Sequence, residues 1–271
     1  MARSSDSERS VSAVRGFVPP RTDEERMLMR HMEDLALAAE RRGIARYSSF
    51  LSDREQSLCE AAMNRAGCTC YEFDGGYPAA ERRIVCVEPE GCWAERPVVC
   101  VQIQCQLFGS NAAPQHKDYL GGLLGLAIKR EGIGDIVLAD TGAAYVFALA
   151  PIAELIVSEL RSVGRVGVTA RILEGELPEN FGLQERVLCS ATVSSLRLDA
   201  VLAAMLRCSR GMASDLIAAG RVEINHIPVE SSSADVYAQD VFTVRGKGRF
   251  QLVGMPGKSK KGRQIIEYFQ Y

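Results

Sequence analysis

Apolar residues recur at helical spacing in two stretches near the start of the chain. The first stretch begins with Thr22 and Glu25, whose spacing forms a capping-box pattern. The second begins with Ser52 and Glu55, which repeat the same pattern. Glycines that suit helix C-termini follow the two stretches: Gly43 and Gly67. These features predict a helical N-terminal unit over residues 21–80.

In the next hundred residues, the pattern alternates between strand and helix. Short runs rich in Val and Ile predict strands, and longer stretches with helical spacing predict helices. The expected strands are 83–88, 97–107, 135–139, 143–148 and 165–173, and the expected helices are 116–130 and 151–163. From residue 97 onward the order is β-α-β-β-α-β, the split β-α-β or ferredoxin-like (RRM-like) arrangement. We assign it to a middle domain over residues 81–180.

This topology does not by itself assign a function. RNA-recognition modules share it, but so do many enzymes and regulatory domains. The aromatic residues on which such modules stack bases are not evident in the expected strands 98–107 and 136–139.

Two short helices and a small sheet are expected between residues 186 and 255. Ser209 suits the N-cap of the second helix, and Gly220 its C-terminal end. Asn225 and His226 form a tight turn between two short strands. The apolar positions of these elements are Leu198, Leu202, Met205, Leu206, Ala213, Leu216, Ile217, Val222, Ile224, Val241, Phe242 and Val244. The whole chain is therefore expected to be an α+β protein.

Composition says little about the fold, but it indicates the number of domains and the cellular location. The 271 residues are 47% hydrophobic and 24% charged, which suits two globular domains or three small ones. No apolar run approaches the roughly 18 residues of a membrane span, and the N-terminus lacks a secretory signal. Residues 1–20 are rich in Ser and Arg and are expected to be a disordered tail. Nine cysteines without a repeating framework favour reduced thiols, so we expect a cytoplasmic protein.

A net charge of −2 conceals an asymmetry between the two parts of the chain. Residues 185–271 hold 12 Lys and Arg against 8 Asp and Glu, a net charge of +4, and residues 1–184 hold 20 against 26, a net charge of −6. Residues 245–263 contain seven basic residues and no acidic one: Arg245, Lys247, Arg249, Lys258, Lys260, Lys261 and Arg263. Such a run is typical of polyanion binding, where phosphate contacts release counterions, or of a solvated arm. We assign residues 256–271 to a basic C-terminal tail.

Patterns that would support catalysis or metal binding are weak. His116 and Asp118 offer a base and a carboxylate, but close neighbours on a helix do not face each other, and either residue can be a polar group of a helix start. Cys68 and Cys70 are too close together for the usual zinc knuckle, and no CxxC pair accompanies them. Four further cysteines lie in or beside expected strands, where cysteine acts as a small apolar residue: Cys86, Cys92, Cys100 and Cys105. We expect no catalytic residue, metal site, cofactor or small-molecule substrate.

A set of fixed spacings runs through the C-terminal part of the chain. Its members are Arg197-Leu198-Asp199, Ser209-Arg210, Ala213, Leu216-Ile217, Gly220, Val222, Ile224-Asn225 and Asp240 through Val244. This pattern resembles the S4 domain, a small RNA-binding module named after a ribosomal protein. Two positions depart from the family: His226 follows Asn225 where the family usually has Gly, and Gln239 stands where a Gly commonly precedes the Asp. Histidine tolerates positive φ better than most residues, so the turn remains allowed.

The flanking segments narrow the resemblance to S4 proteins of the YlmH type. The matching segments are Arg245-Gly246-Lys247-Gly248-Arg249-Phe250, Phe50-Leu51-Ser52-Asp53-Arg54-Glu55-Gln56, Gly75-Gly76 with Glu81-Arg82-Arg83, and His116-Lys117-Asp118-Tyr119-Leu120-Gly121 with Arg130-Glu131 and Gly134-Asp135-Ile136. The resemblance covers most of residues 45–265. It implies a bacterial RNA-binding protein in ribosome-associated quality control, where a stalled large subunit that carries peptidyl-tRNA has its nascent chain extended. A separate naming tradition links the family to cell division through gene neighbourhood.

The S4 resemblance also indicates where RNA would be bound. Arg197, Arg210 and Arg221 are expected near exposed edges, either as phosphate contacts or as ordinary surface arginines. Asp199 is expected to position an arginine or to cap a helix, because a carboxylate repels phosphate. The glycines beside Lys247 either let the backbone approach RNA or serve a turn. The full set of expected RNA-binding residues is Arg197, Ser209, Arg210, Arg221, Asn225, Arg245, Lys247, Arg249, Lys258, Lys260, Lys261 and Arg263.

The leading hypothesis is a non-enzymatic protein that binds structured rRNA, tRNA or both on the large ribosomal subunit. The alternative is an RNA-modifying enzyme, a pseudouridine synthase or a methyltransferase, that uses an S4 domain for delivery. Against this alternative, the one Arg-Leu-Asp segment lies inside the S4 pattern, and no glycine-rich cofactor loop follows a strand. A scaffolding role of the acidic N-terminal part is a third possibility.

Overall fold

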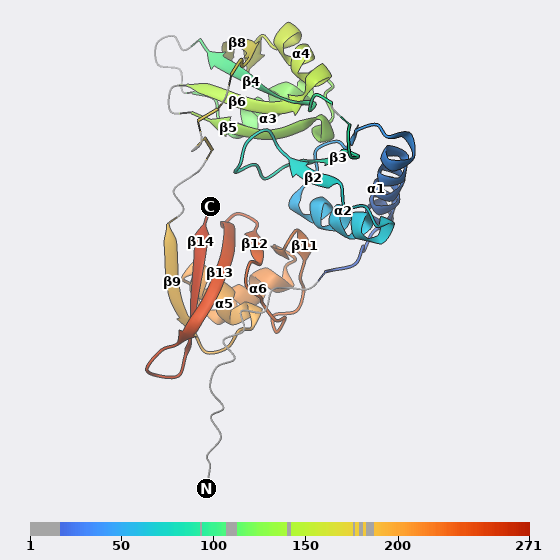
Figure 1. The fold of residues 1–271 in the computed structure, drawn as a ribbon. Helices are drawn as coiled ribbons and strands as arrows, with labels where there is room; N and C mark the ends of the chain where they lie inside the picture. Colours follow the sequence, from blue (N-terminus) through green and yellow to red (C-terminus); the bar gives the residue numbers. More distant parts are fainter. Residues whose placement is uncertain are drawn as a thin grey trace. The chain divides into compact units, whose positions relative to one another are not determined.

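The computed structural model describes residues 17–92, 94–106, 113–139, 142–175, 177–178, 181–182 and 187–271 (Figure 1). These residues form two compact units, one within residues 19–183 and the other made of residues within 184–271 together with residues 17–18. Both units combine helices with antiparallel sheets. In the described ranges, no helix is long and apolar enough to cross a membrane. The predicted tail over residues 1–20 lies outside these ranges up to residue 16.

The first unit opens with the two predicted helices, α1 (Asp23–Arg42) and α2 (Asp53–Ala66). Thr22 caps α1 by accepting a hydrogen bond from the Glu25 backbone, and Ser52 and Glu55 form a reciprocal capping box at α2. Both helices end at the expected glycines, which adopt the left-handed conformation. The helical part of the prediction is therefore confirmed.

A three-stranded antiparallel sheet accompanies these helices. Its order is β1 (Arg46–Tyr47), β3 (Ile84–Val87) and β2 (Tyr71–Asp74), drawn in blue and cyan in Figure 1. All four residues of β3 are buried, because α1 and α2 cover one face and Phe50 and Phe147 pack on the other. The predicted boundary at residue 80 is wrong on this point. The strand expected over 83–88 pairs with the N-terminal strands β1 and β2. Because both of its faces are buried, its sequence is apolar throughout and does not show to which sheet it belongs.

The second sheet of this unit has five antiparallel strands in the order β5-β6-β4-β8-β7. The strands are β4 (Val98–Cys105), β5 (Ile133–Leu138), β6 (Ala143–Leu149), β7 (Ser162–Val163) and β8 (Val166–Ile172). Helices α3 (His116–Gly125) and α4 (Ala150–Glu159) cover one face. Alternate residues of β4 explain the two faces: Val101 and Ile103 pack under the helices, whereas Val98 and Cys100 join the cluster with Phe50 on the opposite side.

Helix α3 is shorter than the predicted helix over 116–130. It stops at Gly125, Ala127 takes a positive φ of 59°, and a short 3-10 turn, η1 (Arg130–Gly132), leads into β5. Three glycines in ten residues weaken the helix, and helical periodicity alone does not show this end.

The second unit is a six-stranded antiparallel sheet with two helices. Its strand order is β11-β10-β12-β13-β14-β9. The elements are β9 (Leu188–Val193), α5 (Leu198–Leu206), α6 (Arg210–Ala218), β10 (Val222–Ile224), β11 (Ile227–Pro228), β12 (Val241–Val244), β13 (Gly248–Lys258) and β14 (Gln264–Gln270). Ser209 caps α6 as predicted, since its side chain accepts a hydrogen bond from the Met212 backbone. The apolar positions predicted for both helices lie in one core with Phe242, Phe250 and Tyr268.

Residues 256–271 do not form the predicted tail. Strand β13 extends to Lys258, and β14 pairs with β13 on one side and with β9 on the other. Ile266 and Tyr268 are buried in the core of the unit. The seven basic residues favour a solvated arm, whereas the strand depends on the apolar alternation that follows them and on pairing with β9, which is far from β14 in the sequence.

Both departures from the S4 pattern fall at positions of positive φ. Asn225 and His226 have φ values of 51° and 62°, as a type I′ turn requires, and Gln239 has a φ of 68°. Glycine is common at such positions because it has no Cβ. The residues present here adopt the same backbone conformation.

Candidate functional site

A carboxylate holds two arginines together where helices α5 and α6 begin. Arg197 Nε lies 3.2 Å from Asp199 Oδ1, and Arg210 Nη2 lies 2.6 Å from Asp199 Oδ2. The Asp199 side chain is 8% exposed, whereas those of Arg197 and Arg210 are 46% and 50% exposed. The three residues therefore present two half-exposed guanidinium groups on a buried anchor.

The anchor is ionised at neutral pH. Burial by itself raises the pKa of Asp199, but hydrogen bonds from Arg210 and Arg197 outweigh burial and hold the pKa below its usual value. Asp199 also accepts a hydrogen bond from the Ala200 backbone at the start of α5. Its role as a positioning and capping group agrees with the expectation from the sequence.

The starts of helices α5 and α6 bring the two arginines to Asp199. Arg197 is the N-cap residue of α5, and the backbone N–H groups of Leu198 and Asp199 donate to the carbonyls of Ala234 and Ser232. Arg210 is the first residue of α6, directly after its cap. Each arginine thus stands at a helix start, where the backbone adds partial positive charge.

A second basic group surrounds the turn between β12 and β13. Arg221 Nη2 donates to the carbonyl of Arg245 over 2.7 Å, and the Arg245 N–H donates to the carbonyl of Arg221. Gly246 and Gly248 have positive φ values of 79° and 107°, so the turn itself requires these glycines. Lys247 stands exposed between them.

Besides Ser209, which caps α6, two further expected contact residues make contacts inside the unit. Asn225 Nδ2 donates to Asp240 Oδ1, and its Oδ1 accepts from the Val241 backbone, so the amide holds the turn in place. The Arg249 guanidinium lies 5.2 Å from the centre of the Tyr271 ring and is partly buried. These two side chains are less available to a ligand than the sequence indicates.

A third basic group occupies the tip of the β13–β14 hairpin, which projects beyond the sheet in Figure 1. Its members are Lys258, Lys260, Lys261 and Arg263. The tip is closed by hydrogen bonds from the Ser259 N–H to the Arg263 carbonyl and from the Arg263 N–H to Ser259 Oγ. All four side chains belong to exposed residues, and among the described residues none of them pairs with a carboxylate.

Strand β13 separates these groups, although they are close in sequence. The ten residue steps from Gly248 to Lys258 span about 33 Å of extended strand. Gln264 pairs with Val193, which places the hairpin tip at the sheet end where the chain leaves β9 towards Arg197. The hairpin tip therefore lies on the side of the bridged arginines, and the β12–β13 turn lies at the other end of β13.

Arg207 is a basic residue of this unit that does not belong to the set expected to bind RNA. It ends α5 with a positive φ of 52°, is exposed, and hydrogen-bonds to Tyr268. Its place between two expected helices is the signal that could have identified it.

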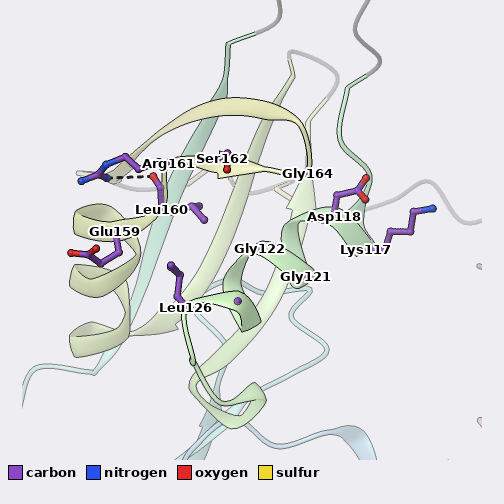
Figure 2. Close-up of a pocket in the computed structure, with 11 residues that line it drawn as sticks. Lys117, Asp118, Gly121, Gly122, Leu126, Glu159, Leu160, Arg161, Ser162 and Gly164 are labelled. Atoms are coloured by element: carbon purple, nitrogen blue, oxygen red, sulfur yellow. Dashed lines mark hydrogen bonds between the residues drawn. The ribbon is translucent and has the colours of Figure 1, made fainter.

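In the first unit, α3 begins beside an open pocket of about 560 Å³ (Figure 2). Lys117, Asp118 and the glycines of α3 line one side, and Glu159, Arg161 and Ser162 line the other. Asp118 accepts a hydrogen bond from the Gln115 backbone, so it caps the helix rather than orienting His116. The helix-start interpretation of Asp118 is confirmed.

Most of the segments that match the YlmH type build an internal junction. Asp135 Oδ2 accepts hydrogen bonds from the Tyr77 hydroxyl and the Glu81 N–H, and its Oδ1 accepts from the Arg82 N–H. Arg82 in turn donates to the carbonyls of Ile133 and Phe50. These contacts join the three-stranded sheet to the five-stranded sheet. These segments therefore have a structural role, because they hold the two sheets of the first unit together.

Buried cysteines are poor candidates for nucleophiles. Burial raises the pKa of the Cys59, Cys86 and Cys100 thiols to about 12, so these groups are protonated at neutral pH. They pack as small apolar residues.

Similarity to known proteins extends over both units of the chain. Residues 196–241 match the model of the S4 domain, and residues 110–175 match the model described as "Putative RNA-binding domain in YlmH". Ribosome-associated protein quality control protein P2 of Bacillus subtilis (strain 168) is 32% identical over 227 residues, which cover 82% of this chain and 85% of that protein. The structure of cell division protein YlmH from Streptococcus pneumoniae aligns with a TM-score of 0.49 and 17% identity, over 58% of this chain and 96% of that one. The chain therefore belongs to the YlmH-type family of S4-domain proteins.

Proposed function

We propose that this protein is a non-enzymatic RNA-binding factor in bacterial ribosome-associated quality control. Its S4 unit binds structured rRNA, tRNA or both on the large ribosomal subunit, and it acts in the cytoplasm. The observation that carries this proposal is the pair Arg197 and Arg210, both held by the buried carboxylate of Asp199.

The chemistry of this pair fits a phosphate backbone. A guanidinium group presents several N–H donors in one plane and remains charged at neutral pH. Because Asp199 already fixes both side chains, little conformational entropy is lost when they bind a phosphate. The exposed hairpin tip at residues 258–263 adds charge on the same side, and the β12–β13 turn adds charge further along the sheet.

Two kinds of similarity support the ribosomal setting. The Bacillus relative is named for ribosome-associated quality control, and the matching segments cover most of both chains. Residues 110–175 match a second domain described as RNA-binding, so the first unit contributes a further RNA contact in this proposal.

We also assign the five-stranded sheet of the first unit to the ferredoxin-like class, because β5-β6-β4-β8 with α3 and α4 on one face has the strand order of a split β-α-β unit.

Crosslinking of the tagged protein in cells, followed by sequencing of the attached RNA, tests the proposal. We expect reads concentrated in large-subunit rRNA and tRNA. Reads spread over messenger RNA, or no enrichment above an untagged strain, would contradict the ribosomal assignment. A modified nucleoside that disappears when the gene is deleted would instead favour the RNA-modifying alternative.

The hairpin tip should contribute charge without contributing stability. Replacing Lys260 and Lys261 by alanine is expected to reduce the slope of log affinity against log salt by about 1–2, since each phosphate contact contributes about 0.9 on duplex DNA. The melting temperature should remain unchanged, because both side chains are exposed.

The matched control replaces Arg41 and Arg42, an exposed basic pair at the end of α1, by alanine. This variant should keep the salt dependence of the wild-type protein. An equal reduction of the slope in both variants would show that net charge, and not the hairpin tip, determines the salt dependence.

A further inference from the structure

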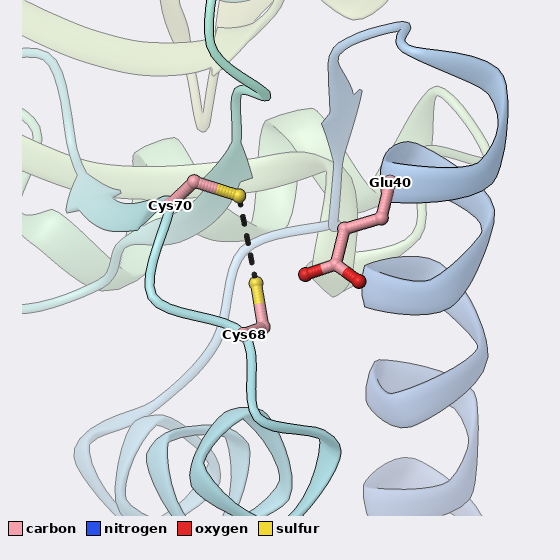
Figure 3. Close-up of side chains that lie close together, drawn as sticks. All are labelled: Glu40, Cys68 and Cys70. Carbon is pink, nitrogen blue, oxygen red and sulfur yellow. Dashed lines mark hydrogen bonds between the residues drawn. The ribbon is translucent and has the colours of Figure 1, made fainter.

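Two cysteines and a glutamate meet at the edge of the core that α1, α2 and the three-stranded sheet form in the first unit (Figure 3). Cys68 follows directly after Gly67, the glycine that ends α2, and Cys70 stands just before β2. Glu40 lies in the last turn of α1, and Figure 3 shows its carboxylate directed towards both sulfurs. Among the described residues, these form the one group in which three ligand-type side chains come within 4.8 Å of one another.

The separation of the sulfurs fits a tetrahedral ion. Cys68 Sγ and Cys70 Sγ lie 3.8 Å apart. Two thiolates at about 2.3 Å from a tetrahedral Zn²⁺ are themselves separated by about 3.8 Å. The two sulfurs therefore already have the spacing of two corners of a zinc tetrahedron.

The backbone keeps these groups in place. The Cys68 N–H donates to the Met63 carbonyl at the end of α2, and the Cys70 carbonyl accepts from the Glu88 N–H next to β3. Cys68 is 2% exposed and is part of the core between α1, α2 and the three-stranded sheet. The fold thus fixes the spacing of the two sulfurs. Glu40 comes from α1, Cys68 follows the end of α2, and Cys70 precedes β2.

The surroundings favour a cation. Glu40 supplies negative charge, and the C-terminal end of α1 adds partial negative charge from its last carbonyls, while the exposed Arg41 and Arg42 of the same turn offset part of this charge. Glu40 is exposed and Cys70 is partly exposed, so an ion can enter and a water molecule can complete the coordination.

We propose that Glu40, Cys68 and Cys70 bind one thiophilic divalent cation of the Zn²⁺ class, which ties the end of α1 to the turn between α2 and β2. Thiolate ligands select such ions over Mg²⁺ and Ca²⁺, which prefer oxygen ligands. This site is independent of the proposed RNA-binding function.

The test uses the full-length protein, fully reduced and freed of metal with a chelator. Titration with Co²⁺ should produce a thiolate-to-cobalt charge-transfer band that saturates at one equivalent, and Zn²⁺ should displace the Co²⁺. Zn²⁺ should also raise the melting temperature, because it binds the folded state. Mg²⁺ at the same concentration should do neither.

Variants separate this site from adventitious binding. Cys70→Ser, at a partly exposed position, should lose the charge-transfer band while keeping the fold by circular dichroism. Glu40→Gln should keep the band but bind more weakly, since both sulfurs remain. Cys189→Ser, a partly exposed free cysteine of the second unit, serves as the matched control and should bind like the wild type. No saturable binding by the reduced wild-type protein, or an unchanged band in Cys70→Ser, would overturn the proposal.

Discussion

Replacing Arg197 and Arg210 together by glutamate should abolish co-sedimentation of the protein with ribosomes. Each arginine offers a charge-assisted contact to phosphate, and loss of two such contacts costs about 3 kcal/mol or more, which is about 100-fold in affinity. Charge reversal adds repulsion from the phosphate backbone. We therefore expect binding to structured rRNA, measured at fixed salt, to fall by at least this factor.

Two further variants distinguish lost binding from lost folding. Glutamates next to Asp199 place three carboxylates together, so the variant with glutamine at both positions provides a milder change that removes charge without adding repulsion. Because the buried Asp199 then lacks both of its positive partners, we expect this variant to melt below the wild type, so its binding is measured at a temperature where circular dichroism shows it folded. Most of the affinity should still be lost. As a matched control, glutamates at Arg26 and Arg65, two exposed arginines of the first unit, should leave ribosome binding unchanged. Unaltered co-sedimentation of the glutamine variant would count heavily against the proposed interface.

Gly134→Ala should be the most destabilising single substitution that we predict. A Cβ at this position would lie 2.6 Å from Phe50 Cε1 and 2.9 Å from Phe50 Cζ, closer than side chains approach one another. Phe50 is 1% exposed and is held by hydrogen bonds from its N–H to the Glu131 carbonyl and from Arg82 to its own carbonyl. It cannot move aside without breaking the junction, so we expect a loss of about 3 kcal/mol, at the upper end of the usual cost of overpacking.

Scanning calorimetry of the full-length protein checks this result. For a unit of this size, such a loss should lower the melting temperature by about 6 °C or more. Gly121→Ala provides a control of opposite sign, because Gly121 lies in α3 and, apart from its chain neighbours and the helix backbone, no atom comes within 4 Å of the position that the added methyl group would take. There, alanine should stabilise the helix by about 0.5–1 kcal/mol. Equal effects at the two positions would show that the contact with Phe50 is not what limits Gly134.

Several residues of the family segments have a structural role at the contact between the two sheets of the first unit. Asp135, Arg82 and Gly134 lie in segments that match the YlmH type, yet all three contribute to the contact between the two sheets of the first unit. Register shifts between Ile133 and Ile136 form a β-bulge that carries Gly134 and Asp135. A motif shared by a family can therefore report how two sheets are joined, and not only where a ligand binds.

Local signals in the sequence were sufficient for several parts of the fold. The sequence predicts helix starts at Thr22 and Ser52 from a capping residue and its Glu partner three positions on, and at Ser209 from the capping residue alone. It predicts the tight turn at Asn225 and His226 from two adjacent residues between short strands. By contrast, strand β14 and the partners of β3 depend on pairing between distant segments, which no local pattern encodes.

The candidate site shows the same division. The sequence selected Arg197, Arg210 and the basic run, and it assigned Asp199 a positioning role because a carboxylate repels phosphate. It did not show that Asn225 and Arg249 are engaged within the unit, or that β13 separates the basic run into two groups. Both facts depend on which strands pair.

By itself, the sequence determined the family, the helix termini and the chemical character of the RNA-binding unit, since these depend on residue types at short, fixed spacings. Only the tertiary structure decided which charges share a surface, which signature residues form the junction between two sheets, and that Glu40 meets Cys68 and Cys70. The physical reason is that strand pairing and helix packing bring together residues that are far apart along the chain, and the free energy of these contacts depends on burial and geometry rather than on sequence distance.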